Sequence, residues 1–504
     1  MLEYKDKFIL LFAPQPTYQG RRVAPISLLA ISCYLDLEGY DIKIFHSYDK
    51  EDYLEALNHL DKAICIGITS MTGYQITDGL EFAKLVRQKN KKVPIVWGGI
   101  HPTILPEQTA KHPLVDIVVK GQGEITFTEL VHRLDKKQPY NDILGITYKK
   151  NGKIINNPDQ PIKRLEEFPP MPYHLLWNME SYLKKTDYGD KHALAYISSQ
   201  GCPHNCRFCY VSHSAFARRW DGYSAKRVVN EIEDLVKKYN VDAIDLRDSN
   251  FFVDEQRVIE ICQRLLDKNL NIGIVTANGR VEQLSKYSQE IWALIKRAGF
   301  KEIVTGMESG DQDMLNLINK CSMIEDSIQF EKFARKHKIQ SLNSFMTGFP
   351  PTTNNPNDYD KAWRKELNAS INVINNIFEI NPLSRIYLFF YTPYFGTDMY
   401  QQSVEQGFKS PQNLEAWGRI DLSERVTPWV TDEHCRKIIL LRILFMLKRI
   451  TSKEFLAIRE YRLKNKILKY LGIYYLINHW VSFRLKHKFF ALPFEILFFK
   501  HKKA

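Results

Sequence analysis

Three cysteines, Cys202, Cys206 and Cys209, lie within eight residues of one another in the stretch GCPHNCRFCY. Clustered thiolates bind zinc or iron–sulfur clusters. A structural zinc site takes four ligands, usually as separated pairs. His204 or His213 could complete such a set, but Cys-x3-Cys-x2-Cys is not a common zinc spacing. A 4Fe–4S cluster is normally held by four cysteines, so three would leave one iron with an open position. The spacing favours this cluster.

The other five cysteines are scattered along the chain and make a poor disulfide framework, which the reducing cytosol would not keep. The N-terminal stretch MLEYKDKFILLFAP has acidic residues before a short apolar run and no small-residue cleavage pattern. We therefore predict no signal peptide and a cytoplasmic protein. The scattered cysteines are Cys33, Cys65, Cys262, Cys321 and Cys435.

The stretch CPHNCRFCY resembles the CxxxCxxC loop of the radical S-adenosylmethionine (SAM) superfamily, with Phe208 and Tyr210 on either side of the last cysteine. The resemblance implies that Cys202, Cys206 and Cys209 each bind one iron of a 4Fe–4S cluster. It also implies that the open iron chelates the amino and carboxylate groups of SAM, and that the backbone near Tyr210 meets the adenine. Reduction by an external donor, a flavodoxin or ferredoxin, then gives methionine and a deoxyadenosyl radical.

Elements that could position this chemistry follow the cysteines. Four segments each contain a short apolar run that ends in polar residues, with helical stretches between them: 242–252, 270–280, 300–320 and 339–350. Residues 387–397 resemble the sixth strand and loop of the radical SAM core. Alternating strands and helices predict a partial (β/α) barrel, whose chemistry gathers at the carboxyl ends of the strands.

The expected strand ends carry polar side chains that could contact SAM. Asp248, Asn250, Asn278 and Arg280 are expected to point toward the barrel cavity. The stretch GMESGDQDMLNLINK resembles the fourth-strand motif of the superfamily, which implies that Glu308 approaches the SAM ribose. For each of these residues, a solvated or helix-capping role is the alternative.

Apolar runs also alternate with helical stretches near the N-terminus: FILLFAP, DIKIF, AICIGIT, VPIVWGG and DIVVKGQGE. This alternation predicts a parallel, doubly wound sheet of the Rossmann-like, flavodoxin-like kind. Ligands of such sheets lie beyond the carboxyl ends of the strands. Glycines at these ends let the backbone approach a bulky ligand, although they equally suit tight turns. A dinucleotide site is disfavoured, because no GxGxxG follows the first run.

Residues 8–134 resemble the cobalamin-binding domain found at the N-terminus of many radical SAM enzymes. The resemblance implies a cobalamin over the strand ends, with these neighbours: Ser70, Met71, Thr72, Gly98, Gly99, His101, Gly121, Gly123 and Glu124. The sequence lacks the DxHxxG signature of cobalamin-dependent mutases and methionine synthase, so a histidine supplied to cobalt in that way is not expected. His101 could be the ligand, but a histidine beside Pro102 is more typical of a hydrogen-bonding turn residue.

Changes of composition divide the chain into four parts. We expect residues 1–145 to form the cobalamin-binding domain, and 146–187 to form a linker rich in Pro, Asn and charge. Residues 188–410 are expected to form the radical SAM core, and 411–504 a helical, basic and aromatic C-terminal region. The predicted fold class is α/β.

The two cofactors together suit methyl transfer to an unactivated carbon. One SAM methylates cobalamin, and a second gives the radical that takes a hydrogen atom from the substrate. The pair also resembles the anaerobic Mg-protoporphyrin monomethyl ester cyclase, in which no methyl group is transferred, and no residue separates these outcomes. A tRNA methylthiotransferase needs extra N-terminal cysteines for a second cluster, and a non-enzymatic sensor would more often carry a DNA-binding element. The sequence shows neither feature.

The formal charge of +12 is concentrated at the C-terminus. Residues 431–504 hold 17 Lys and Arg against 5 Asp and Glu, a difference of +12, so the rest of the chain is close to neutral. We therefore expect no nucleic-acid partner.

The C-terminal tail has two interpretations. Residues 436–450 are expected to form a helix buried against the barrel. The longest apolar stretch after it, 470–483, is broken by Asn478 and His479 and is too short to span a bilayer. The tail either caps the active site or lies on the inner face of the membrane, which would suit a lipid or tetrapyrrole substrate. The aromatic residues that would enter the headgroup region are Trp480, Phe483, Phe489, Phe490, Phe498 and Phe499.

Overall fold

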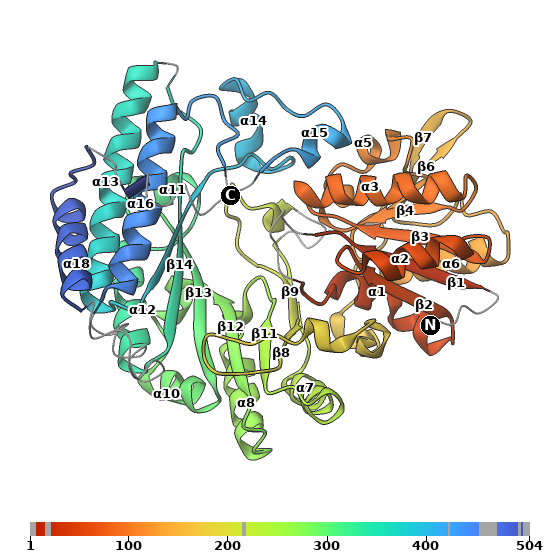
Figure 1. The fold of residues 1–504 in the computed structure, drawn as a ribbon, viewed down its shortest axis with the longest axis horizontal. Coiled ribbons are helices and arrows are strands. Elements are labelled where there is room, and N and C mark those ends of the chain that lie inside the picture. Colours follow the sequence, from red (N-terminus) through yellow and green to blue (C-terminus); the bar gives the residue numbers. More distant parts are fainter. Residues whose placement is uncertain are drawn as a thin grey trace. The chain divides into compact units, whose positions relative to one another are not determined.

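The structure, a computed structural model, describes residues 7–15, 22–213, 218–353, 355–421, 424–452, 471–491 and 495–496. The chain forms two compact units (Figure 1). The first unit comprises Met1–Pro203, Tyr210–Ile244 and Lys409–Leu422. The second unit comprises His204–Cys209, Asp245–Phe408 and Ser423–Ala504.

The first unit contains a sheet in the order β2-β1-β3-β4-β5-β6-β7. Its first five strands are parallel neighbours in the order 2-1-3-4-5, which is the flavodoxin-like order. The predicted doubly wound sheet is therefore confirmed. The strands are β1 (Phe8–Ala13), β2 (Asp41–His46), β3 (Ala63–Thr69), β4 (Ile95–Gly98), β5 (Ile117–Val119), β6 (Ile146–Lys150) and β7 (Lys153–Asn156).

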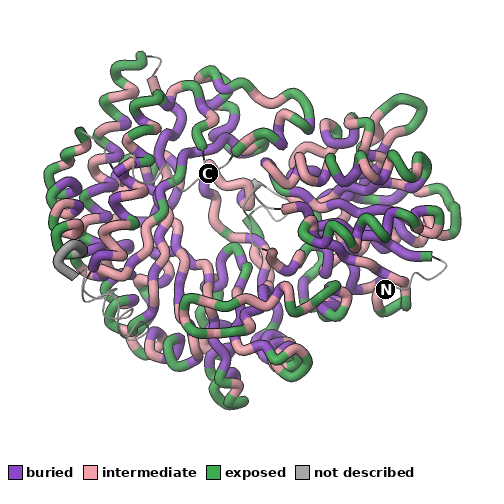
Figure 2. The backbone as a smooth tube through the Cα atoms, viewed as in Figure 1, coloured by how far each residue is buried: buried purple, intermediate pink, exposed green. Residues whose placement is uncertain are grey.

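Helices connect the parallel strands, as their crossover connections require. They are α1 (Ile26–Leu37), α2 (Lys50–Ala56), α3 (Tyr74–Lys89), α4 (Ile100–Ile104), α5 (Pro106–Lys111) and α6 (Gly123–Asp135). Helices α1 and α6 pack against each other. Every residue of β1 is buried, and the strands of this sheet form the core of the unit (Figure 2).

The last two strands of this sheet, β6 and β7, differ from the predicted linker. They form an antiparallel hairpin, and β6 pairs antiparallel with β5 at the edge of the sheet. Asn151 and Gly152 between them both have positive φ angles, 51° and 76°. Positive φ at both central positions suits a two-residue hairpin turn, and Asn-Gly is its strongest sequence signal. The region 146–187 therefore begins with two strands of the first sheet.

The second unit contains strands in the order β15-β14-β13-β12, and β11, which ends in this unit, comes next in the order. Strands β12 to β15 are parallel neighbours. The strands are β11 (Ala243–Leu246), β12 (Gly273–Gly279), β13 (Phe300–Glu308), β14 (Gln340–Thr347) and β15 (Arg385–Phe390). The helices that alternate with them include α8 (Glu255–Asp267), α9 (Val281–Leu284), α10 (Gln289–Arg297), α11 (Gln312–Leu317), α12 (Ile324–Lys336) and α13 (Pro356–Ile380). This is the alternation predicted for a partial barrel.

Two C-terminal helices of the second unit pack beside α13 (Figure 1): α16 (Asp432–Ile450) and α18 (Leu471–Lys486). Helix α16 buries Ile438, Leu441 and Leu444 and contacts β15, which confirms the buried helix predicted over 436–450. Within the residues that the structure describes, no helix is long and apolar enough to cross a membrane.

Candidate functional site

The carboxyl ends of β3 and β4 meet at Ser70 and Gly99. The Ser70 N–H donates to the Gly98 carbonyl at 2.9 Å, and the His101 N–H donates to the Ser70 carbonyl at 3.1 Å. Gly99 has a φ of 94° and a ψ of −165°, a region open essentially to glycine alone. A Cβ there would lie 2.7 Å from Thr69 Oγ1. Residue 99 must therefore be glycine, because the two strand ends are in contact.

Open positions at this edge fit a ligand that approaches the backbone closely. A Cβ on Gly98 would meet only the Val119 carbonyl, at 3.6 Å. The Ser70 hydroxyl is buried and has no hydrogen-bond partner among the described residues. Met71 is 39% exposed, and its N–H donates to Gln75 Oε1 at 2.7 Å. The backbone at Gly98 has no side chain above it, the Ser70 hydroxyl lacks a partner, and the Met71 side chain is exposed. These three features fit the cobalamin that the resemblance predicts here.

A short helix from the C-terminal part of the chain packs on the same unit. Helix α15 (Leu414–Gly418) contacts α3. Thr77 Oγ1 donates to the Gly418 carbonyl at 3.0 Å, and His112 Nε2 lies 3.0 Å from Glu415 Oε1. A Cβ on Gly418 would lie 2.6 Å from Thr77 Oγ1, so the contact leaves room only for glycine. The helix lies within the region 411–504 that is predicted to be helical, but no motif indicates that it packs on the first unit.

His101 lies inside this contact. It is 1% exposed, and its Nδ1 and the Thr72 hydroxyl are 2.9 Å apart in a hydrogen bond. Its ring centroid is 5.6 Å from that of Trp417 on α15. Burial lowers the pKa of His101 to about 3, so the imidazole is neutral. The ring hydrogen-bonds to Thr72 and is covered by Trp417, in line with the hydrogen-bonding role, and the place of His101 beside cobalamin remains a prediction.

The loop after β5 has an open part and a packed part. Gly121 has a φ of 68°, and its N–H donates to Thr103 Oγ1 at 3.0 Å. A Cβ on Gly123 would lie 3.1 Å from Ile31 Cγ2, so Gly123 allows α6 to approach α1. Glu124 is buried in the first turn of α6, and burial raises its pKa to about 7. Gly121 is exposed, so it is the residue of this loop that a ligand could approach.

The cysteine loop contributes to both units. Cys202 belongs to the first unit, and Cys206 and Cys209 belong to the second. None of the eight cysteines, all of them in the described part of the chain, forms a disulfide. In the same part of the chain, no three His, Cys, Asp or Glu side chains are grouped so that they could hold a metal ion. The donor set of the loop, three thiols, still fits an iron–sulfur cluster with an open iron better than zinc, which takes four protein ligands.

Arg280 directly follows β12 and lies against Cys206. Its Nη1 donates to Cys206 Sγ at 3.2 Å. Its Nε donates to the Glu282 carboxylate, and its Nη2 donates to the Lys320 carbonyl. Each of the three guanidinium nitrogens therefore donates a hydrogen bond to a group of the protein. A contact between Arg280 and SAM remains a prediction. Burial and the charges of Arg280 and Lys320 lower the pKa of the neighbouring His204 to about 4, although Glu282 opposes this shift.

Glu308 ends β13 in an unusual conformation. Its φ is 66°, in the left-handed region, and the register of β13 against β14 shifts between Gly306 and Glu308. Such irregularities re-aim a side chain at functional sites. Its carboxylate pairs with the buried Lys320 ammonium at 3.2 Å and lies over Gly306, where a Cβ would clash with it. Lys320 is the last residue of the motif GMESGDQDMLNLINK, and no sequence pattern marks it as a functional residue.

The other predicted SAM contacts make local bonds. Asn278 Nδ2 donates to the Asp248 carbonyl at 2.7 Å, and Asn250 Nδ2 donates to Gln283 Oε1 at 2.8 Å. Asp248 and Asn250 are buried. These residues hold the ends of β11 and β12 together in the second unit. Tyr210 belongs to the first unit, so the structure does not bring all the predicted SAM contacts into one unit.

A buried carboxylate that was not among the predicted site residues joins the ends of β13 and β14. Glu366 on α13 accepts hydrogen bonds from the Ser309 hydroxyl at 2.7 Å and from the Thr347 hydroxyl at 3.0 Å. Ser309 directly follows Glu308, and Ser370 also donates to Glu366. Burial raises the pKa of Glu366 to about 7, although these hydrogen bonds oppose the shift. No helical pattern predicts that one glutamate on α13 should point inward, so the contact is visible only in three dimensions.

Glu366 should make stability depend on pH. Its folded-state pKa is raised above the ordinary value, so its contribution is fully present at acidic pH and is lost as the pH rises through about 7. We expect Glu366→Gln to reduce the fall in melting temperature between pH 5.5 and pH 8.5, with an effect of roughly 1–3 kcal/mol. Glu379→Gln, on the exposed face of the same helix, is the control and should leave the pH profile unchanged. An unchanged profile for Glu366→Gln would contradict the assignment.

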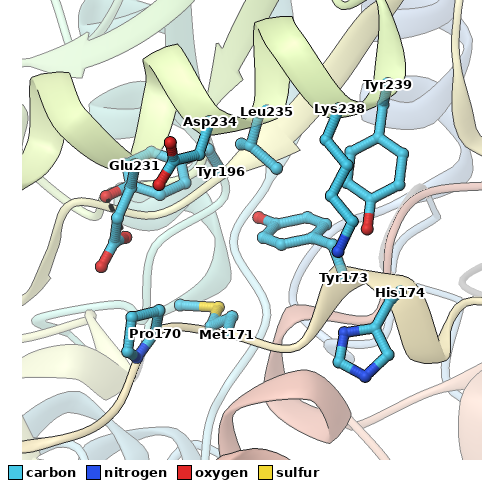
Figure 3. A pocket seen from close by; sticks show the side chains of 10 residues that line it. All are labelled: Pro170, Met171, Tyr173, His174, Tyr196, Glu231, Asp234, Leu235, Lys238 and Tyr239. Carbon is cyan, nitrogen blue, oxygen red and sulfur yellow. Dashed lines mark hydrogen bonds between the residues drawn. The ribbon is translucent and has the colours of Figure 1, made fainter.

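A pocket of about 120 Å³ lies in the first unit, between α7 (Ala225–Tyr239), β8 (Ala193–Tyr196) and the segment around Tyr173 (Figure 3). The Tyr173 hydroxyl donates to the Ala195 carbonyl at 2.8 Å, and the Tyr196 hydroxyl donates to Glu231 at 2.7 Å. These hydroxyls already have partners in the protein, so we assign no ligand to the pocket.

Comparisons with known proteins identify two domains in the chain. Residues 20–131 match the B12 binding domain, and residues 196–359 match the radical SAM superfamily. An uncharacterized methyltransferase of Pyrococcus horikoshii is 30% identical over 93% of this chain and 98% of its own length. The anaerobic magnesium-protoporphyrin IX monomethyl ester cyclase of Synechocystis is 27% identical over 68% of this chain and 69% of its own.

The fold also matches a solved structure. TsrM of Kitasatospora setae, a radical SAM methyltransferase whose structure holds cobalamin and a [4Fe–4S] cluster, superposes with a TM-score of 0.62. The match covers 79% of this chain and 75% of TsrM at 16% identity, so it shows a shared fold. The predicted fold class and cofactor set, a 4Fe–4S cluster, SAM and cobalamin, agree with these findings. The chain belongs to the family of cobalamin-dependent radical SAM enzymes.

Proposed function

We propose that this enzyme transfers a methyl group from SAM to an unactivated carbon of a small-molecule substrate. One observation carries the proposal. The Pyrococcus relative, which is named a methyltransferase, matches nearly the whole of both chains. The two matched domains supply the two cofactors that such a transfer uses.

Bound SAM, cluster and cobalamin supply a deoxyadenosyl radical and a methyl carrier, and the protein binds, orients and shields them. In the proposed enzyme, Cys202, Cys206 and Cys209 hold the cluster. Glu308, fixed by Lys320, accepts hydrogen bonds from the SAM ribose. The edge around Ser70 approaches the cobalamin. Tyr210, Asp248, Asn250 and Asn278 complete the proposed SAM surroundings.

The stoichiometry of the proposed reaction can be measured. Two SAM, one substrate and two electrons give the methylated product, S-adenosylhomocysteine, methionine and 5′-deoxyadenosine. The enzyme, reconstituted anaerobically with iron, sulfide and cobalamin, is incubated with SAM that carries a labelled methyl group and with a cell extract. We expect label in a product, in an amount equal to the 5′-deoxyadenosine formed. Deoxyadenosine without transferred label would overturn the proposal.

The cyclase-like reaction is the second candidate, because the Synechocystis cyclase matches 68% of this chain. It uses the same cofactors without methyl transfer. The same experiment separates the two, since only methyl transfer moves the label. A non-enzymatic sensor would form no deoxyadenosine in proportion to a product.

Radical SAM chemistry needs an external electron donor, and we propose a flavodoxin or ferredoxin for this role in the cytoplasm. We propose no nucleic-acid partner, because the excess positive charge lies in residues 431–504 and the rest of the chain is close to neutral.

We also propose that the tail contacts the inner face of the membrane, which would suit a lipid or tetrapyrrole substrate. Helix α18 packs on α16 and α13, in line with a capping helix. It still leaves Tyr475, Leu476 and Phe483 exposed. Trp480 is half-buried, and its Nε1 donates to Glu495 at 3.0 Å. Phe489 is exposed, while Phe498 and Phe499 lie outside the described residues. The exposed face of α18 is thus the proposed contact.

Flotation with anionic vesicles tests this contact. We expect the double variant Tyr475→Ser, Leu476→Ser to float several-fold less than the unchanged protein, because apolar burial at the interface drives binding. Leu37→Ser is the control, since Leu37 is an exposed leucine on α1 in the first unit. Equal flotation of the double variant, or no flotation of any protein, removes the proposal.

A further inference from the structure

A buried arginine makes a direct hydrogen bond to one of the predicted cluster ligands. Arg280 is 6% exposed, and its Nη1 lies 3.2 Å from Cys206 Sγ. The Arg280 side chain lies in the second unit with Cys206, so this contact is internal to one unit. The superfamily motif, which contains only the cysteines, gives no indication of it.

The orientation of this guanidinium is fixed by two contacts besides the one to Cys206. Nε is held by the carboxylate of Glu282, two residues further along the chain. Nη2 is held by the Lys320 carbonyl. Because a guanidinium is planar and presents its N–H groups as a rigid fork, these two contacts leave Nη1 pointing at the sulfur. The bond to Cys206 therefore follows from the surrounding structure.

The two cations of this network, Arg280 and Lys320, each have a partner of opposite charge. Arg280 is paired with Glu282, and Lys320 is paired with Glu308. A directional donor then acts on the sulfur without a large net charge beside it.

We propose that Arg280 raises the reduction potential of the 4Fe–4S cluster through its N–H···S hydrogen bond to Cys206. Hydrogen bonds to cluster sulfurs are one of the determinants of cluster potential. A single electron from the external donor adds negative charge to the cluster and its thiolates, and no bond forms or breaks in this step. The donated hydrogen bond is stronger to the more negative, reduced state. It therefore favours reduction of the cluster by the donor.

This inference rests on Cys206 binding the cluster, but not on methyl transfer. The potential is a property of the reconstituted enzyme without substrate, so the inference and the proposed reaction can fail separately. It also gives Arg280 a role other than the SAM contact expected from its position at a strand end.

The test is a redox titration of the reconstituted full-length enzyme, followed by the electron paramagnetic resonance signal of the reduced cluster. Arg280→Lys keeps the positive charge but loses the planar set of N–H donors, and Arg280→Gln loses both the charge and that set of donors. In both variants, we expect the ratio of reduced to oxidised cluster at a fixed poise to fall about tenfold, which equals about 59 mV for a one-electron couple. Iron content should stay at the level of the unchanged enzyme.

Arg207→Lys is the matched control. Arg207 is the neighbour of Cys206 in the chain, but its Nη1 donates to the Leu317 carbonyl at 3.0 Å. This variant should leave the midpoint unchanged. A full iron content with an unchanged midpoint in both Arg280 variants overturns the proposal, and so does an equal shift in Arg207→Lys.

A second variant decides the question if the Arg280 variants lose iron. Glu282→Asp keeps the negative charge beside Arg280 but moves the carboxylate that holds its Nε back by one methylene group. With the charge kept and the guanidinium no longer aligned on Cys206, the reduced fraction at a fixed poise should fall. An unchanged or higher reduced fraction in Glu282→Asp contradicts the proposal.

Discussion

Replacing Cys206 by alanine should abolish SAM cleavage. The expected loss of deoxyadenosine formation is at least about a thousandfold, equivalent to roughly 4 kcal/mol of lost transition-state stabilisation. In this variant only two thiolates remain, and two cannot hold the 4Fe–4S cluster with a single iron left open for SAM. Iron content and the visible absorption of the cluster after anaerobic reconstitution measure the first effect. Chromatography of 5′-deoxyadenosine measures the second.

The matched control for this experiment is Cys435→Ser, on α16, which should keep both iron and activity. The variant with Cys202, Cys206 and Cys209 all changed to alanine gives the decisive outcome. If it retained the cluster spectrum and still cleaved SAM, the assignment of the three cysteines would be wrong.

Gly99→Ala should damage cobalamin binding and stability together. The backbone conformation at Gly99 costs an alanine about 1–3 kcal/mol, before any clash is counted. The new Cβ would also lie 2.7 Å from Thr69 Oγ1 and 2.9 Å from the Ser70 carbonyl, so the ends of β3 and β4 would have to separate. We expect a fall in melting temperature and at least about a tenfold loss of cobalamin affinity, equivalent to 1.4 kcal/mol.

Gly152→Ala separates conformational strain from the clash. Gly152 also has a positive φ, 76°, but a Cβ there would meet nothing within 4 Å. This variant should lower the melting temperature less than Gly99→Ala and leave the cobalamin content of the reconstituted enzyme unchanged. Equal cobalamin content in the two variants would show that the contact between the strand ends does not shape the cobalamin site.

The sequence predicted the sheets well, because their signals are local. Each apolar run ends at a glycine or a polar residue, and the observed strands β1 to β5 and β11 to β15 lie on those runs. The hairpin of β6 and β7 had an equally local signal in Asn151-Gly152, but the surrounding charge suggested a linker. Here the turn signal of Asn-Gly outweighs the charged composition of the residues around it.

The contacts inside the candidate site were less predictable, because they join residues far apart in the sequence. Arg280 and Cys206 are separated by 74 positions, and Glu366 and Ser309 by 57. Periodicity identifies which face of a helix is apolar, but not which polar side chain on a strand end or helix finds a distant partner. The sequence therefore indicated Arg280 as a functional residue and left its partner open.

The return of α15 to the first unit limits how the protein can be cut. A fragment that ends at residue 203 would lack Trp417, so the His101 ring would lose the aromatic side chain that covers it. The same fragment would lack Glu415, which hydrogen-bonds to His112. Truncation after the first sheet would therefore yield a domain with an uncovered surface, prone to aggregate when expressed alone. A stable isolated cobalamin domain would need residues 409–422 grafted back onto it, since the chain completes that domain only after traversing the barrel.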